Sequence, residues 1–492
     1  MLLCVLYDYK MVNRDTVTKS LFWKFLERCT AQLITLIIGI ILARLLAPED
    51  FGALSILMVF VGLSVILTEA GFNTALIQKV DTDEKDYGTV LIISLLIAAI
   101  LYLSLFLLAP FIASFYSYAG LDNTMKVIAL VLFPNAINSV FTAKVSREFQ
   151  YKKLFYANLG GSVISGLVGV FLAYAGFNLW ALVIQQLLGS FLICVILRIQ
   201  LRWWPKLCYS SERAKRLFSF GWKLMVANVA DSLFSNFRAL LIGKAFDTNA
   251  LGYYSQAQQY PQAISKNINS SIGSVMLPTL SNVQDNLDTV KAMTRRSIKL
   301  STYLVFPVLL GFAAISDSFV SLVLTEKWAP CIILIKILCV MFLFEPLITI
   351  NSQARNAIGK SGIHLFIVII AKAFDLGVLV FTWLVFNTIE AIAIGQVISA
   401  VFNAIVGGVI NNKLIGYRIK EQLLDVIPNF IVSLIMYVIV SLLLFLQWPL
   451  ILTLFSQVLI GGISYILMSK FFRNESYNYL KDYVVQKINR KQ

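Results

Sequence analysis

Histidine, charged residues and cysteine motifs are scarce in this sequence, and each scarcity argues against a class of function. The 492 residues include one histidine, His364, which excludes mechanisms that need two imidazoles, such as a His-rich metal site. The six cysteines form no C-x-x-C pair, so neither a zinc site nor a disulfide framework is expected. Only 14% of the residues are charged, against about 25% in soluble domains. A water-soluble enzyme is therefore disfavoured.

Enzyme signatures are also missing from the sequence. There is no Walker lysine motif, which argues against ATP hydrolysis by this chain. There is no G-x-S-x-G motif of a serine hydrolase either. No acidic pair lies on a large loop, as a membrane glycosyltransferase would require. We expect a protein that is not an enzyme and that holds no metal ion or cofactor.

Long apolar runs are abundant. Hydrophobic residues make up 59% of the chain, and a membrane-spanning helix needs about 20 mostly apolar residues. We therefore predict an all-α polytopic membrane protein with about 14 transmembrane helices. The expected spans are 22–46, 52–77, 88–116, 124–143, 155–175, 179–199, 217–245, 250–279, 299–324, 332–353, 362–386, 389–411, 427–446 and 449–470. The first run leads into LLAPEDFG rather than a small-residue cleavage site, so no cleavable signal peptide is expected.

Positive residues predict the orientation of these helices. The formal net charge is +15, and Lys and Arg are concentrated in every second connection, beginning with the N-terminal segment. The connections on the opposite side hold only Arg44, Lys126, Lys244 and Lys327. We therefore predict that both termini are cytoplasmic. The positive charge then reports membrane topology rather than nucleic-acid binding.

An internal repeat relates the two halves of the chain. The segment LARLLAPEDFGALS resembles IGKAFDTNALGYYS, with Gly52 aligned to Gly252 and Ser55 aligned to Ser255. The offset corresponds to six helices, an even number, so both halves enter the membrane in the same direction, as in transporters built from parallel repeats. The predicted domains are an N-lobe at 1–205 (helices 1–6), a C-lobe at 206–420 (helices 7–12), and helices 13 and 14 with a cytoplasmic tail at 421–492.

Polar residues inside the predicted spans indicate a hydrophilic cavity. Gln32 lies on a polar stripe of the first helix. The eighth helix is polar along its whole length, with helical spacing of Ser255, Gln259, Gln262, Lys266 and Asn269. A helix this polar cannot face lipid. We predict that these side chains line water or a hydrated ligand.

Positive residues within the spans suggest what the cavity binds. Each costs roughly 2.5–3.5 kcal/mol at a helix centre, so such residues usually face a cavity or a partner rather than lipid. The predicted cationic lining is Arg28, Lys223, Arg238 and Lys266. Such an excess of positive charge suits an anion, and phosphates match Arg and Lys well. The alternative for each cation is pairing with a neighbouring carboxylate, or for Lys223 snorkelling to the interface. Glu69 and Asp231 are the candidates for coupling to a proton or sodium gradient.

The sequence resembles a known family. FWKFLERCTAQLITLIIGIILARLLAPEDFGALS, followed by EAGFNTALIQ and VSREFQYKKLFYAN, is similar to Wzx-type polysaccharide flippases. Within them it resembles the colanic-acid and teichuronic-acid branch of the multidrug/oligosaccharidyl-lipid/polysaccharide (MOP) superfamily. The resemblance continues through LGYYSQAQQYPQ and QARNAIGKSG and covers nearly the whole chain. It implies two six-helix lobes plus two additional helices.

This resemblance implies a flippase that moves undecaprenyl-diphosphate-linked oligosaccharides across the bacterial inner membrane by alternating access, for surface polysaccharide biosynthesis. The implied partners are the lipid-linked oligosaccharide, membrane lipids, a polysaccharide polymerase and glycosyltransferases, and no nucleic acid. The family has no fixed catalytic motif. The resemblance therefore implies only cationic cavity residues, which map to Arg28, Arg238 and Lys266.

Two other functions stay open at this point. One is a cation-coupled multidrug exporter of the same superfamily, which normally has twelve helices and a cavity suited to cations. The other is a membrane polysaccharide polymerase, which needs sizeable periplasmic loops, whereas the outer connections predicted here are short. The extra helices and the basic lining favour the flippase.

Overall fold

The computed structural model describes residues 14–79, 81–479 and 481–482, and throughout these residues the regular secondary structure is helical. Eleven helical segments of this described part are long and apolar enough to cross a membrane. Three further long helices, α2 (Arg14–Leu45), α10 (Ser211–Ala245) and α11 (Thr248–Ser281), complete a pattern of fourteen. The predicted fold class, an all-α polytopic membrane protein, is confirmed.

The remaining helices follow the predicted spans in order. They are α3 (Pro48–Glu69), α4 (Phe72–Gln78), α5 (Glu84–Tyr116), α6 (Leu121–Ile128), α7 (Leu132–Arg147), α8 (Tyr151–Tyr174), α9 (Leu179–Leu201), α12 (Leu287–Phe319), α13 (Cys331–Phe342), α14 (Glu345–Ala357), α15 (Ser361–Phe386), α16 (Ile389–Ile415), α17 (Ile419–Leu442) and α18 (Leu450–Phe471). In some spans two consecutive helices follow each other: α3 and α4 together form one candidate span, and α13 and α14 form another.

Residues at the N-termini of these helices favour the start of a helix. Pro48 opens α3, where the missing N–H of proline costs nothing because the first N–H groups of a helix have no partner in the helix. Asp50 then accepts a hydrogen bond from the backbone N–H of Ala47 at 3.1 Å. Thr388 caps α16 by accepting the N–H of Ala391 at 3.2 Å. Such caps define where one membrane helix starts within a short connection.

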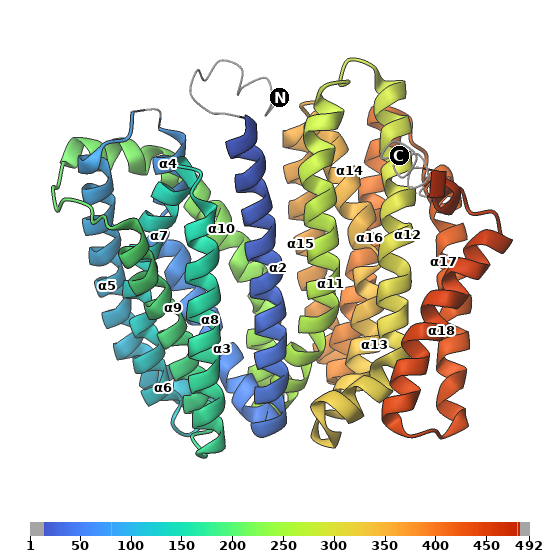
Figure 1. Cartoon of the computed structure of the whole chain (residues 1–492), viewed down its shortest axis with the longest axis horizontal. Helices are drawn as coiled ribbons and strands as arrows, with labels where there is room; N and C mark the ends of the chain where they lie inside the picture. Colours follow the sequence, from blue (N-terminus) through green and yellow to red (C-terminus); the bar gives the residue numbers. More distant parts are fainter. Residues whose placement is uncertain (1–13, 80, 480, 483–492) are drawn as a thin grey trace. The chain divides into compact units, whose positions relative to one another are not determined.

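The chain divides into two compact units, and the boundary lies inside α11. The N-terminal unit ends at Ser255 and the C-terminal unit begins at Gln256. Each unit is a bundle of long helices (Figure 1). The lobe boundaries predicted from the repeat fall elsewhere in the sequence and stay a prediction.

Within the N-terminal unit, the aligned repeat residues contact one another. A Cβ atom at Gly52 would lie 1.7 Å from the backbone oxygen of Thr248, and one at Gly252 would lie 1.9 Å from that of Pro48. Ser55 donates a hydrogen bond to the hydroxyl of Ser255 at 2.9 Å. This reciprocity, in which residue i meets j and j meets i, is what a local two-fold axis produces. The contact supports the repeat that we infer from sequence.

Helices α17 and α18, red in Figure 1, pack beside α12 in the C-terminal unit. Asp425 of α17 accepts two hydrogen bonds from Arg295 of α12, at 2.7 and 2.8 Å. One turn further on, Asn429 donates to the hydroxyl of Thr302 at 2.9 Å. The two helices outside the repeat are therefore attached to the bundle by buried polar contacts as well as by apolar packing.

Candidate functional site

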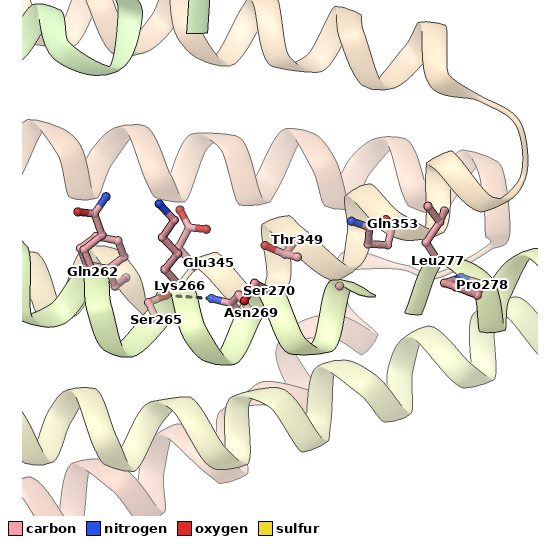
Figure 2. Close-up of a pocket in the computed structure, with 12 residues that line it drawn as sticks. Gln262, Ser265, Lys266, Asn269, Ser270, Leu277, Pro278, Glu345, Thr349 and Gln353 are labelled. Atoms are coloured by element: carbon pink, nitrogen blue, oxygen red, sulfur yellow. Dashed lines mark hydrogen bonds between the residues drawn. The ribbon is translucent and has the colours of Figure 1, made fainter. Parts of the chain in front are cut away.

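A cavity of about 710 Å³ lies within the C-terminal unit, between α11 and the α13–α14 segment. Figure 2 shows the α11 side chains of its wall along one stretch of that helix, with α14 side chains opposite them. The lining residues are Gln262, Ser265, Lys266, Asn269, Ser270, Gly273, Leu277, Pro278, Phe342, Glu345, Thr349 and Gln353. Six of these twelve residues carry an amide or a hydroxyl group, so the cavity can hydrogen-bond a hydrated ligand.

Three of the predicted site residues line this cavity together. Gln262, Lys266 and Asn269 stand four and three positions apart on α11, which places them on one helix face. Lys266 and Gln262 are exposed, whereas Asn269 is buried and donates to the hydroxyl of Ser265 at 2.9 Å. That hydrogen bond holds the Asn269 side chain in place. The Lys266 side chain is exposed at the cavity wall.

The opposite wall was not predicted from the sequence. Glu345, Thr349 and Gln353 follow one another at intervals of four along α14 and all line the cavity. Glu345 brings a carboxyl group to the same cavity as Lys266, and the two side chains are drawn near each other in Figure 2. The cavity therefore contains one carboxyl group and one lysine amino group. The spacing of four was visible in the sequence, but nothing in it indicated that α14 packs opposite α11.

The other predicted residues do not line this cavity. Lys223 and Asp231 are exposed on α10, and Arg238 is 8% exposed on the same helix. Gln32 of α2 and Glu69 at the end of α3 are half-buried, and these five residues belong to the N-terminal unit.

Three further positions complete the predicted set. Ser255 is bonded to Ser55, and Gln259 is half-buried on α11. The side chain of Arg28 lies outside the described residues. Whether the cationic residues of the two units serve one ligand stays a prediction.

Arg355 differs from its sequence interpretation. It follows the predicted span 332–353 and so falls in a predicted connection, but α14 continues to Ala357 and Arg355 is 3% exposed. Its guanidinium donates to the side-chain oxygen of Asn411 at 3.0 Å and to the backbone oxygen of Gly407 at 3.3 Å. Asn411 in turn donates to Asn351 at 2.8 Å. Neutral acceptors thus hold a buried cation at this end of the bundle.

The fold resembles those of two solved structures. Aligned over 92% of this chain and 99% of the other, it resembles a structure titled "Lipid II flippase MurJ, inward closed conformation", with a TM-score of 0.74 and 14% identity. It also resembles an inward-facing multidrug resistance MATE family transporter of the MOP superfamily, with a TM-score of 0.62 and 18% identity over 78% of this chain and 94% of the other. At such identities the likeness concerns the fold.

The sequence then gives the family. Residues 41–333 match the family model described as "Polysaccharide biosynthesis protein", and the chain belongs to this family. The teichuronic acid biosynthesis protein TuaB of Bacillus subtilis is 23% identical, over 73% of this chain and 74% of its own length. The lipopolysaccharide biosynthesis protein WzxC of Escherichia coli is 22% identical, over 65% and 72%. The succinoglycan biosynthesis transport protein ExoT of Rhizobium meliloti is 22% identical, over 65% of this chain and 64% of its own length.

Proposed function

We propose that this protein is a flippase that moves polyprenyl-diphosphate-linked oligosaccharides across the bacterial inner membrane by alternating access. Its family membership and its MOP-type fold support this function. The observation that carries the proposal is the cavity of the C-terminal unit, where Lys266 of α11 stands among amide and hydroxyl groups. We take α11 to lie within the membrane, because the candidate spans of the chain flank it on both sides. Polar groups at this depth are costly unless they serve a ligand or a water-filled path.

The chemistry of the cavity fits the two polar parts of such a substrate. An ammonium group offers three donors and a full charge to a diphosphate. Gln262, Thr349 and Gln353 offer donors and acceptors for sugar hydroxyls. The carboxyl group of Glu345 lines the same cavity and can offset part of the charge of Lys266. A bound diphosphate would take over that role, while the polyprenyl chain remains in the lipid.

Several finer statements belong to the same proposal. We propose that both termini lie in the cytoplasm, because Lys and Arg concentrate in the connections on the same side as the termini. Coupling to a proton or sodium gradient is proposed through Glu69 or Asp231. A polysaccharide polymerase and glycosyltransferases are proposed as the enzymes that act after and before the transfer step.

Replacing Lys266 tests the proposed function. We expect Lys266→Ala to lower transfer of the lipid-linked oligosaccharide to the outer leaflet about tenfold or more, since a hydrogen bond to a charged group is worth about 1.5–3 kcal/mol. Lys266→Arg, which keeps the charge, should restore most of the activity. The measurement is the fraction of glycolipid accessible from outside, in cells that lack the chromosomal copy, at matched protein levels.

The matched control is Lys336→Ala. Lys336 is a lysine of the α13–α14 span that pairs with Asp317 at 2.7 Å and does not line the cavity. We expect transfer close to that of the wild type. Unchanged transfer in Lys266→Ala would reject the site.

Export of a cationic dye that depends on Glu345 and not on Lys266 would instead favour the multidrug exporter, for which the cavity carboxyl is the supporting observation.

A further inference from the structure

A second cavity, of about 500 Å³, lies inside the N-terminal unit between α2, α3, α7, α8 and α9. Among the described residues that line it, none carries a charge. Its polar groups are amides and hydroxyls, and they come mainly from Asn135, Asn138, Ser162, Gln185, Gln186 and Ser190. Three helices, α7, α8 and α9, therefore direct these neutral polar side chains to one place. Such a grouping is costly in lipid unless it binds water or a ligand.

Part of this polar lining is held in place. Ser190 donates to the side-chain oxygen of Asn135 at 2.5 Å, and Asn138 donates to the backbone oxygen of Ser190 at 3.0 Å. The remaining oxygen of Asn138 is buried and accepts no hydrogen bond from the described residues. An acceptor left in this state costs about 1–3 kcal/mol unless a donor reaches it. Water or a ligand hydroxyl would supply that donor.

Two glutamines supply the groups that are available to a ligand. The side-chain amides of Gln185 and Gln186 form no hydrogen bond with any other described residue, yet both line the cavity. Each amide offers two N–H donors and one oxygen acceptor. Such pairs of donors and acceptors match the hydroxyl groups of a sugar, which both donate and accept.

Most of the remaining wall is apolar, with the hydroxyl groups of Thr35 and Ser165 as exceptions. Ile34, Ile38 and Val61 offer surfaces for the C–H face of a sugar ring, and a Cβ atom at Gly62 would meet nothing within 4 Å. The volume lies within the range of about 300–1,000 Å³ that is typical of small-molecule sites. Because the lining has no cation, the cavity does not suit a diphosphate, and because it has no carboxylate, it does not suit a cationic drug.

We propose that this neutral cavity binds uncharged sugar residues of the transported glycan. The inference rests on the proposed function, because it assigns the glycan of that substrate a binding site of its own. Gln185 and Gln186 recognise the sugar hydroxyls, and the space beside Gly62 receives the ring. The sugars then have partners in this cavity in addition to Gln262, Thr349 and Gln353 of the cavity that contains Lys266.

The test uses the full-length protein in nanodiscs and two independent changes. Gln185→Met with Gln186→Met keeps the side-chain volume and removes the amides, and neither glutamine makes a hydrogen bond within the described structure that the change would break. Gly62→Phe fills the open space. The matched control is Gly377→Phe, since Gly377 is also a helical glycine whose Cβ would meet nothing within 4 Å, but it does not line the cavity.

The probe is the repeat-unit oligosaccharide released by mild acid from the cell's own lipid-linked pool, without lipid or diphosphate. We expect the wild type, Gly377→Phe and Lys266→Ala to bind it, and both cavity variants to bind it at least tenfold more weakly. In cells, both variants should also lower outer-leaflet transfer about tenfold. If both variants bind and transfer as the wild type does, the inference is wrong and the proposed function stands. If the wild type transfers no lipid-linked oligosaccharide, the proposed function itself fails.

Discussion

Gly52→Ala is expected to remove most of the folded protein from the membrane. The added methyl group would lie 1.7 Å from the backbone oxygen of Thr248 and 3.0 Å from the backbone nitrogen of Gly252. Backbone atoms cannot rotate away as a side chain can, so α3 and α11 would have to separate. Overpacking usually costs about 1–3 kcal/mol, and we expect at least the upper end of that range here. Gly252→Ala should act alike, because its Cβ would lie 1.9 Å from the backbone oxygen of Pro48.

The measurement for this prediction is the yield of monodisperse protein in detergent and its melting temperature. Gly462→Ala is the matched control, because this glycine of α18 has nothing within 4 Å of its Cβ position. Alanine is favoured over glycine by about 0.5–1 kcal/mol within a helix, so this variant should be neutral or slightly more stable. A Gly52→Ala protein that melts like the wild type would contradict the close approach of the two helices.

Asp425→Ala is expected to lower the free energy of unfolding by about 2–3 kcal/mol. The Asp425 side chain is 4% exposed and accepts hydrogen bonds from Arg295 and, at 2.8 Å, from the hydroxyl of Tyr417. Lys299 pairs with the same carboxylate at 3.2 Å. Removal of the carboxylate leaves these donors without their acceptor. The expected loss stays below that of a fully buried pair because Arg295 and Lys299 are partly exposed to solvent.

Thermal melting in detergent measures this effect. Comparison of Asp425→Ala, Arg295→Ala and the double variant gives the coupling free energy between the two residues. The control is Lys291→Ala, which breaks the more exposed pair with Glu421 at 2.8 Å and should cost about 0.2–1 kcal/mol. Equal losses for Asp425→Ala and Lys291→Ala would mean that the α12–α17 contact contributes no more than a surface ion pair.

Most of the helix order could be predicted from the sequence, for a physical reason. In lipid, each segment must satisfy its backbone hydrogen bonds internally, so a long apolar run is a helix whatever its neighbours are. The polar helix α11 was also predicted, because Gln262, Lys266 and Asn269 share a face at helical spacing. Both inferences depend on residues close together in the sequence.

Arg355 illustrates where this reasoning fails. Arg355 is the third residue of QARNAIGKSG, and its position after the predicted span 332–353 suggested a connection rather than a helix. The structure extends α14 past it and encloses the guanidinium between Asn411 and Gly407, which lie more than fifty positions further along the chain. Burial of this kind depends on which helix packs alongside, and local patterns do not report that.

The sequence by itself determined the membrane helices, the repeat and one wall of the cavity in the C-terminal unit, because local hydrophobic pattern and helical spacing are enough for each. The tertiary structure alone decided that Glu345 shares that cavity with Lys266 and that Gln185 and Gln186 meet Asn138 around a neutral cavity. These groups come from different helices. Their proximity follows from how the helices pack, which no single stretch of sequence specifies.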